Sequence, residues 1–227
     1  MGPAGLIDGA RRAAGLLFSR PCLACGGPVP DPALGAACEG CWARLEAEPL
    51  PRLRFTRLGR PDFDQAVAAF AYGGTLRELV LAYKFSGHPS LRRPLAAALA
   101  RRCEAALGWG CGAVAALPWS RASLGERGYD AAGELARDVA AAWGLPVLDA
   151  LAWARPRRRQ SELGANERLA NASLSLRARP GAGLAGGRIL IIDDLLSSGA
   201  TAHEAARALK AGGATFVGVA ALAHALA

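Results

Sequence analysis

The chain has 227 residues and a mass of 23.4 kDa, which is room for one globular domain and a small additional module. Its 52% hydrophobic and 20% charged residues exclude an intrinsically disordered chain, which would be poorer in apolar side chains. Basic residues outnumber acidic ones by 27 to 19, and the net charge of +8 favours anionic partners such as phosphorylated metabolites or nucleic acid.

No membrane segment is expected. Asp8, Arg11 and Arg12 interrupt the apolar residues near the N-terminus, which also lacks the basic region that begins a signal peptide. The apolar run at residues 216–227 is shorter than the roughly 18 residues that span a bilayer. We therefore expect a cytoplasmic protein that has no membrane partner.

Four of the six cysteines form two closely spaced pairs in the pattern C-x2-C-x12-C-x2-C. They are Cys22, Cys25, Cys38 and Cys41. Two such pairs complete the tetrahedral shell of four thiolates that zinc prefers, and the metal would supply the folding energy that so short a segment lacks. Two disulfides are the alternative, which a reducing compartment disfavours. Cys103 and Cys111 fit no ligand spacing, and we expect them to be buried thiols.

The remaining chain alternates between strand and helix patterns. Residues 1–50 are expected to form the zinc ribbon with a leading helix, residues 51–62 a linker rich in proline and arginine, and residues 63–227 the larger domain. The first part of that domain is expected to contain, in chain order, a strand at 64–72, a helix at 91–107, a strand at 112–117, a helix at 131–143 and a strand at 147–151. A long polar loop at 155–187 follows. The last part is expected to contain a strand at 188–192, a helix at 202–211 and a strand at 215–222. This alternation predicts an α/β domain with a parallel sheet, whose ligands bind at the carboxyl ends of the strands.

The loop between the last strand and helix pair combines acids with small hydroxyl residues. Ser197, Ser198, Gly199, Ala200 and Thr201 would form a phosphate cradle from hydroxyls, backbone N–H groups and the positive end of the helix dipole. The preceding Asp193 and Asp194 would repel a phosphate, so they need another partner. Hydroxyls of an attached sugar and a Mg²⁺ ion held partly by substrate oxygens would supply it, and a ribose 5-phosphate fits.

The alternative for this loop is purely structural. Thr201 or Ser198 would then only cap the helix, and both acids would end a strand in solvent.

The segment ILIIDDLLSSGAT resembles the phosphoribosyl pyrophosphate (PRPP) motif of type I phosphoribosyltransferases. From about Leu16 to the C-terminus the chain resembles the ComF family, which joins a zinc ribbon to a phosphoribosyltransferase-like domain. Further matching pieces, in the order of the family, are Tyr83-Lys84-Phe85-x-Gly87, Pro118 with Arg121 and Glu126-Arg127-Gly128-Tyr129, and Gln160-x2-Leu163-x4-Arg168-x2-Asn171. The resemblance therefore implies a type I phosphoribosyltransferase fold.

The resemblance also implies roles for individual residues. Asp193 and Asp194 would hold the ribose hydroxyls, and Ser197 to Thr201 the 5-phosphate. Pro118 to Arg121 would lie in the pyrophosphate loop. Lys84, Arg121 and Arg127 would contact the diphosphate, on which negative charge develops as it leaves. Without the resemblance, Lys84 is only a lysine at a helix end and Arg127 an exposed arginine.

One stretch departs from the family. Where the family commonly continues Arg-Gly-Phe-Asn-Gln, this chain has Arg127-Gly128-Tyr129-Asp130-Ala131, which loses two amides and gains a negative charge. We therefore expect PRPP binding to be better retained than recognition of the acceptor.

Three functions follow from these patterns. The first is a Mg²⁺-dependent enzyme that transfers the phosphoribosyl group of PRPP. Because the ComF resemblance implies natural competence and DNA uptake, the second is a non-catalytic factor that binds single-stranded DNA or competence proteins. Against DNA binding, the 6% of aromatic residues do not interleave with basic ones as a stacking surface would require. The third is a regulator that senses PRPP without turnover.

Overall fold

The computed structural model describes residues 20–55, 60–85, 88–118, 130–154 and 176–225. Several predictions lie outside these ranges. They are the leading helix before residue 20, the site residues Arg121 and Arg127, Gly87, the Glu126 to Tyr129 stretch, the part of the predicted loop at 155–175, and with it the matching pieces from Gln160 to Asn171.

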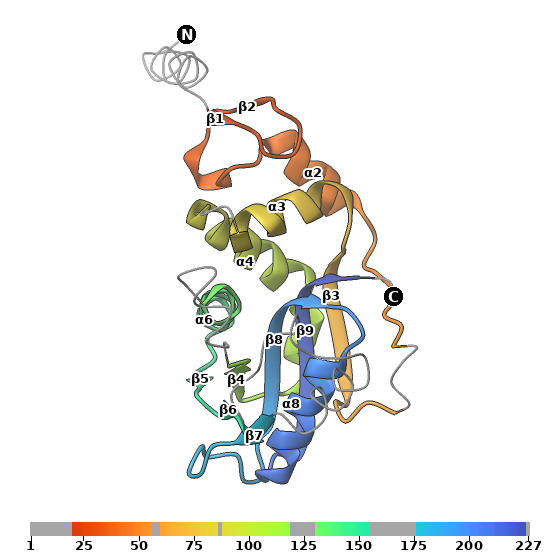
Figure 1. Ribbon diagram of the computed structural model, residues 1–227, viewed down its shortest axis with the longest axis vertical. Coiled ribbons are helices and arrows are strands. Elements are labelled where there is room, and N and C mark those ends of the chain that lie inside the picture. Colours follow the sequence, from red (N-terminus) through yellow and green to blue (C-terminus); the bar gives the residue numbers. More distant parts are fainter. Residues whose placement is uncertain (1–19, 56–59, 86–87, 119–129, 155–175, 226–227) are drawn as a thin grey trace, which may run out of the picture.

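A parallel five-stranded sheet, in the order β3-β9-β8-β4-β5, forms the centre of the larger domain (Figure 1). Its strands are β3 (Gln65–Ala71), β4 (Ala113–Ala116), β5 (Val147–Leu148), β8 (Arg188–Leu196) and β9 (Phe216–His224). The predicted α/β class is thus confirmed. Strand β8 is longer than predicted, because backbone pairing with β9 continues past Ile192 and matches Asp193 with Ala221.

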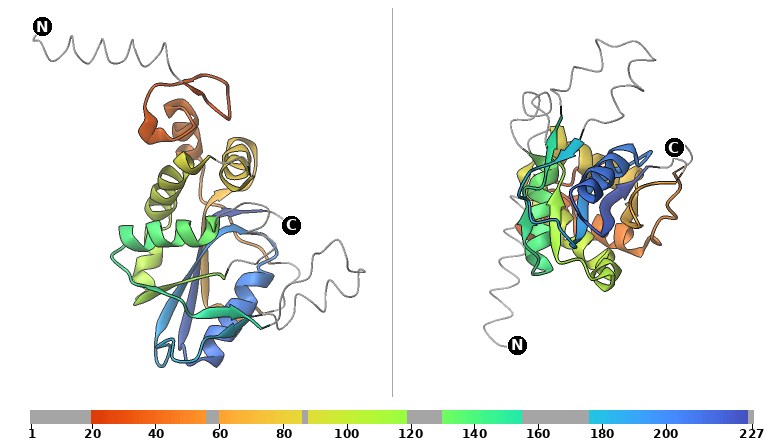
Figure 2. Two further views of the ribbon diagram at one scale, coloured as in Figure 1. Left: turned by 60° about the vertical axis from the view of Figure 1, so that its left-hand side comes forward. Right: turned by 90° about the horizontal axis from the view of Figure 1, so that it is seen from below.

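Helices cover both faces of this sheet (Figure 2). They are α4 (Arg92–Arg102) and α6 (Ala131–Ala142) on one face and α8 (Ala200–Ala211) on the other, while α3 (Gly74–Phe85) lies across one end of the strands (Figure 1). Leu190 and Ile192 of β8 pack in one cluster with residues of α4 and α6, whereas Ile189 and Ile191 pack in another with α8. This double burial explains why the strand is an unbroken apolar run.

Two predicted elements are divided in the structure. The helix predicted at 91–107 consists of the 3₁₀ turn η2 (Pro89–Leu91), α4 and the 3₁₀ helix η3 (Glu104–Trp109), because the chain leaves the α conformation at the buried Cys103. The strand predicted at 147–151 splits into β5 and β6 (Leu151–Trp153). Strand β6 pairs antiparallel with β7 (Leu176–Ala178) outside the main sheet.

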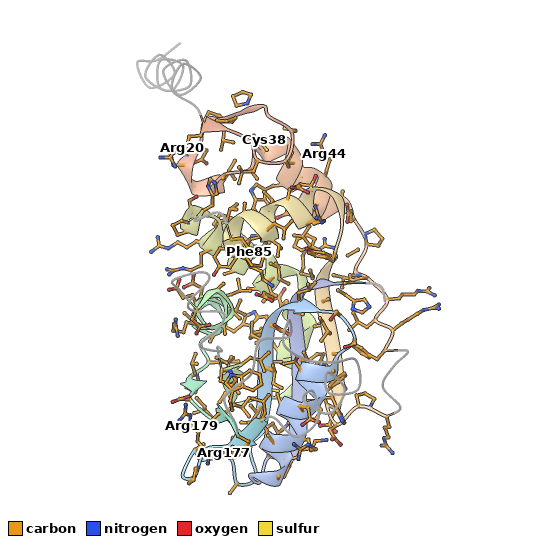
Figure 3. The ribbon with its side chains drawn as sticks, in the orientation of Figure 1. Arg20, Cys38, Arg44, Phe85, Arg177 and Arg179 are labelled. Atoms are coloured by element: carbon orange, nitrogen blue, oxygen red, sulfur yellow. The ribbon has the colours of Figure 1, made fainter. Side chains whose placement is uncertain are left out.

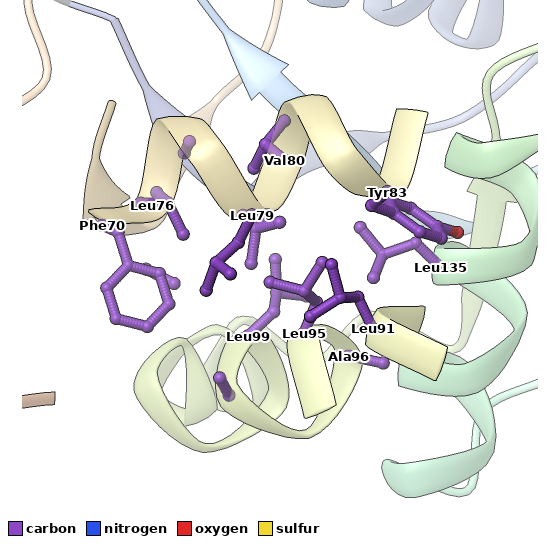
Figure 4. Packing of buried hydrophobic residues seen from close by; sticks show 14 of the residues in the cluster. Phe70, Leu76, Leu79, Val80, Tyr83, Leu91, Leu95, Ala96, Leu99 and Leu135 are labelled. Carbon is purple, nitrogen blue, oxygen red and sulfur yellow. The ribbon is translucent and has the colours of Figure 1, made fainter. Parts of the chain in front are cut away.

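The N-terminal module contains the short strands β1 (Arg20–Pro21) and β2 (Pro28–Val29), the 3₁₀ turn η1 (Pro32–Leu34) and helix α2 (Glu39–Ala47). Its buried Cys41, Trp42 and Leu45 belong to the same hydrophobic cluster as the leucines of α3 and α4, part of which Figure 4 shows. Gly35, at a φ of 71°, passes so close to η2 that a Cβ there would lie 2.8 Å from the carbonyl oxygen of Ser90. The module is therefore packed against the larger domain.

The guanidinium of Arg102, at the end of α4, reinforces this packing. It donates hydrogen bonds to the carbonyl oxygens of Glu46 at 2.7 Å, Glu48 at 2.6 Å and Ala69 at 2.7 Å, and it lies over the ring of Phe70. One side chain thus joins the end of α2 to β3.

None of the described helices combines the length and apolar character that crossing a membrane requires.

Candidate functional site

The four paired cysteines form a compact cluster in the N-terminal module, where Figure 3 labels Cys38 and Arg44. All four Sγ atoms lie within 4.8 Å of one another, with 3.7 Å between Cys22 and Cys41 and 3.6 Å between Cys25 and Cys38. A tetrahedral zinc with bonds of about 2.3 Å places its sulfur ligands about 3.8 Å apart. The cluster therefore has the dimensions of a zinc site.

Nearby donors are arranged to stabilise thiolates in this cluster. The Cys38 N–H donates to Cys22 Sγ at 3.3 Å, and the Arg44 guanidinium donates to Cys41 Sγ at 3.0 Å. Burial disfavours the Cys22 thiolate, but backbone N–H groups more than compensate and lower its pKa to about 6. Burial and the neighbouring cysteines raise the pKa of Cys41 to about 12, despite Arg44. Zinc would have to displace the Cys41 proton.

A second candidate site lies at the carboxyl edge of the sheet, where β4 and β8 are neighbours. The chain leaves β4 towards β5 through α6 and leaves β8 towards β9 through α8, in opposite directions along the sheet. Parallel sheets bind ligands in the crevice at such a topological switch point. Helix α3 lies across the same edge (Figure 1).

The two predicted acids occupy this edge and are buried. Asp193 is 9% exposed and Asp194 is 7% exposed, so the alternative in which both acids end a strand in solvent is wrong. Lys84 Nζ, from the last turn of α3, contacts Asp194 Oδ1 at 2.7 Å, and both side chains are about nine-tenths buried. The Asp194 N–H donates to Asp193 Oδ1 at 2.8 Å. Burial and repulsion by Asp194 raise the pKa of Asp193 to about 7, against the attraction of Lys84.

The loop from Ser197 to Gly199 follows directly, and α8 begins at Ala200. Gly199 adopts a φ of 77°, in the left-handed region, where another residue would be strained. As the N-cap residue it has no side chain with which to cap α8, and Ser198 Oγ accepts only a long bond of 3.4 Å from the Ala200 N–H. The exposed Ser197 and Thr201 flank this turn. The geometry leaves the start of α8 open to an anion.

Residues around α6 complete the described part of the edge. Asp130 Oδ1 accepts a hydrogen bond of 3.0 Å from the Gly133 N–H and so caps α6, which gives this departure from the family a structural role. The Tyr83 hydroxyl donates to the carbonyl oxygen of Ala131 at 2.8 Å. The carbonyl of Pro118 accepts from Trp153 Nε1 at 3.0 Å.

The structure thus brings Lys84 to the acid pair, whereas the resemblance places it on the diphosphate. Three contacts were not predicted from the sequence: this ion pair, the hydrogen bond of the Tyr83 hydroxyl and the contact of Arg44 with Cys41. Arg44 alone had a signal, because it follows Cys41 by three residues within one helix and so lies on the same face.

Comparisons with known proteins concern mainly the C-terminal part. Residues 126–227 match the family described as phosphoribosyl transferase domain. No curated protein matches the chain significantly. Among solved structures, the chain is similar to the allosteric regulatory enzyme of purine biosynthesis, at 23% identity with a TM-score of 0.43. It is also similar to a glutamine PRPP amidotransferase from B. subtilis complexed with ADP and GMP, at 21% identity with a TM-score of 0.41.

Each structural similarity covers 63% of this chain and 30% of the other protein. The family match covers residues 126–227, which is less than half of this chain.

Proposed function

We propose that the protein binds Mg²⁺-PRPP at the loop after β8 and transfers its phosphoribosyl group to a nitrogen acceptor. The observation that carries this proposal is the buried acid pair at the switch point, followed at once by a hydroxyl-rich turn that opens α8. A sugar phosphate has both the hydroxyl donors that carboxylates need and the phosphate that a helix start attracts.

Each group has a distinct task in this reaction. The carboxylates of Asp193 and Asp194 accept hydrogen bonds from the ribose hydroxyls, while Ser197 to Thr201 hold the 5-phosphate. The acceptor lone pair forms a bond to C1 as the bond from C1 to the diphosphate oxygen breaks, and pyrophosphate leaves with that electron pair. The acceptor then releases its proton to solvent. Lys84 adds a protein cation at the same edge, and a Mg²⁺ ion brought with PRPP would supply further positive charge against the charge that develops on the leaving group.

Calorimetric titration of Mg²⁺-PRPP into the wild type and into the double variant Ser197→Ala, Thr201→Val tests this assignment. Both residues are exposed, so their replacement leaves the core intact. Losing hydrogen bonds to a charged phosphate should weaken binding at least about tenfold. The control is Thr215→Val, which removes hydroxyl bonds to the carbonyl oxygens of Gly186 and Gly187 at the other end of the sheet. Equal affinities for all three proteins would reject the loop as the phosphate site.

We also propose that the protein is a cytoplasmic ComF-type protein. Support comes from the presence of a zinc-sized cysteine cluster and a phosphoribosyl transferase domain in one chain, and from free thiols that suit a reducing compartment. Its ComF-type role in DNA uptake predicts tight binding of single-stranded DNA that requires the cysteine module. Weak binding that 200 mM salt abolishes would reflect only the net positive charge and would argue against that role.

A further inference from the structure

Tyr83 places a hydroxyl inside the core. The residue is fully buried, with 0% of its surface exposed, among leucines of α3, α4 and α6, and its oxygen points towards α6 in Figure 4. That hydroxyl donates to the carbonyl oxygen of Ala131 at 2.8 Å, which joins the last turn of α3 to the first residue of α6. A phenylalanine would fill the same volume, so packing alone does not require the oxygen.

The two chain segments joined by this bond both approach the acid pair. Lys84 is the next residue along α3, and its ammonium contacts Asp194. On the other side, Ala131 begins α6, the helix that follows the connection from the carboxyl end of β4. Strands β4 and β8 are neighbours in the sheet, so α6 and the loop after β8 follow two adjacent strands. The hydroxyl therefore fixes the spacing between the last turn of α3, which carries Lys84, and the start of α6.

We propose that Tyr83 is a positioning residue, which holds Lys84 and the start of α6 in the arrangement that binds the diphosphate part of PRPP. This inference rests on the proposed function and adds a residue that acts without touching the ligand. Asp193 and Asp194 contact the ribose from β8, whose backbone pairing with β9 fixes them without this bond, and the 5-phosphate partners lie at the start of α8. The loss of the hydroxyl should therefore affect the two halves of the ligand unequally.

The test compares Tyr83→Phe with the wild type in calorimetric titrations of Mg²⁺-PRPP and of ribose 5-phosphate, which lacks the diphosphate. We expect Tyr83→Phe to weaken PRPP binding about tenfold and to leave ribose 5-phosphate within about threefold. Thr215→Val, which also removes a hydroxyl bonded to backbone carbonyls, should change neither affinity. An equal loss for both ligands, or no loss for PRPP, would overturn the inference.

A double-mutant cycle with Lys84→Met provides the second measurement. If Tyr83 acts through Lys84, Tyr83→Phe should weaken PRPP binding far less in the Lys84→Met background than in the wild type. Fully additive losses would overturn the positioning role. Failure of the wild type to bind PRPP would instead reject the proposed function itself, so the two failures are distinguishable.

Discussion

Asp193 and Asp64 show how position in the sheet gives two carboxylates opposite energetic roles. Asp193 lies at the carboxyl end of β8, where burial and Asp194 raise its pKa to about 7. Asp64 precedes β3 at the other end, where burial is outweighed by the Val217 N–H at 2.7 Å and Lys210 at 2.9 Å, so its pKa is lowered. The surroundings of Asp193 therefore destabilise its charged form, whereas those of Asp64 stabilise its charged form.

Asp193→Asn should stabilise the protein above pH 7. The raised pKa means that the folded state holds the Asp193 proton more tightly than the unfolded state, so the wild type loses stability as pH rises from about 4 to 7. Asparagine carries no charge and avoids this loss. We expect a gain of about 1 to 3 kcal/mol at pH 8 that shrinks as the pH approaches 4. Urea unfolding at pH 8 and pH 5 measures it, and a gain independent of pH would contradict this explanation.

Asp64→Asn should have the opposite sign. Because the folded pKa is lowered, the stabilisation by the Asp64 carboxylate is present above its unfolded pKa of about 4 and is lost as pH falls through the folded value. We expect the variant to lose about 1 kcal/mol at pH 8, since it weakens the contacts with Lys210 and Val217. The same urea series checks this, and a stability equal to that of the wild type at pH 8 would refute it.

Among the described elements, those of the N-terminal module surround the cysteine cluster, and we expect their stability to depend on a metal. Elemental analysis should find about one zinc per chain, and the double variant Cys38→Ser, Cys41→Ser should lose it, because two ligands cannot hold the ion. Arg44→Met, which removes only the donor to Cys41, should retain the metal with lower affinity. A metal-free wild type with an intact module would contradict the zinc assignment.

Helix α4 anchors this module through Arg102. Arg102→Met removes three hydrogen bonds to the carbonyl oxygens of Glu46, Glu48 and Ala69 and should cost about 2 kcal/mol of unfolding free energy. The exposed Arg93 of the same helix provides the control, because Arg93→Met should change stability by less than about 0.5 kcal/mol. Equal effects of the two variants in chemical denaturation would show that Arg102 is not an anchor.

The elements with strong periodicity were predictable, and the contacts between them were not. The apolar run of β8 and the amphipathic α6 follow from local patterns, and the cysteine spacing alone anticipated that the four thiols form a cluster. The extension of β8 through Asp193 was missed because pairing with β9 overrides the local preference of aspartate for strand ends. The pairing of Lys84 with Asp194 joins residues 110 positions apart in the chain, and no local pattern encodes it.

At the scale of the whole molecule, the packing of the cysteine module supports the site from a distance. The module contacts α3 and η2, the elements on either side of residues 86–87, while the end of α3 presents Lys84 to β8. The segment that carries the acid pair and the α8 turn and the segment that carries Lys84 therefore converge from two distant parts of the chain. The central claim is that this convergence forms a PRPP site.

Calorimetric titration of Mg²⁺-PRPP into the zinc-loaded wild type and the double variant Asp193→Asn, Asp194→Asn tests this claim most directly. Circular dichroism establishes that the variant is folded. We expect saturable binding to the wild type and no measurable binding to the variant, since asparagine cannot supply the charge that the ribose hydroxyls and Mg²⁺ require. Equal affinity in the folded variant, or no binding to the wild type, would contradict it.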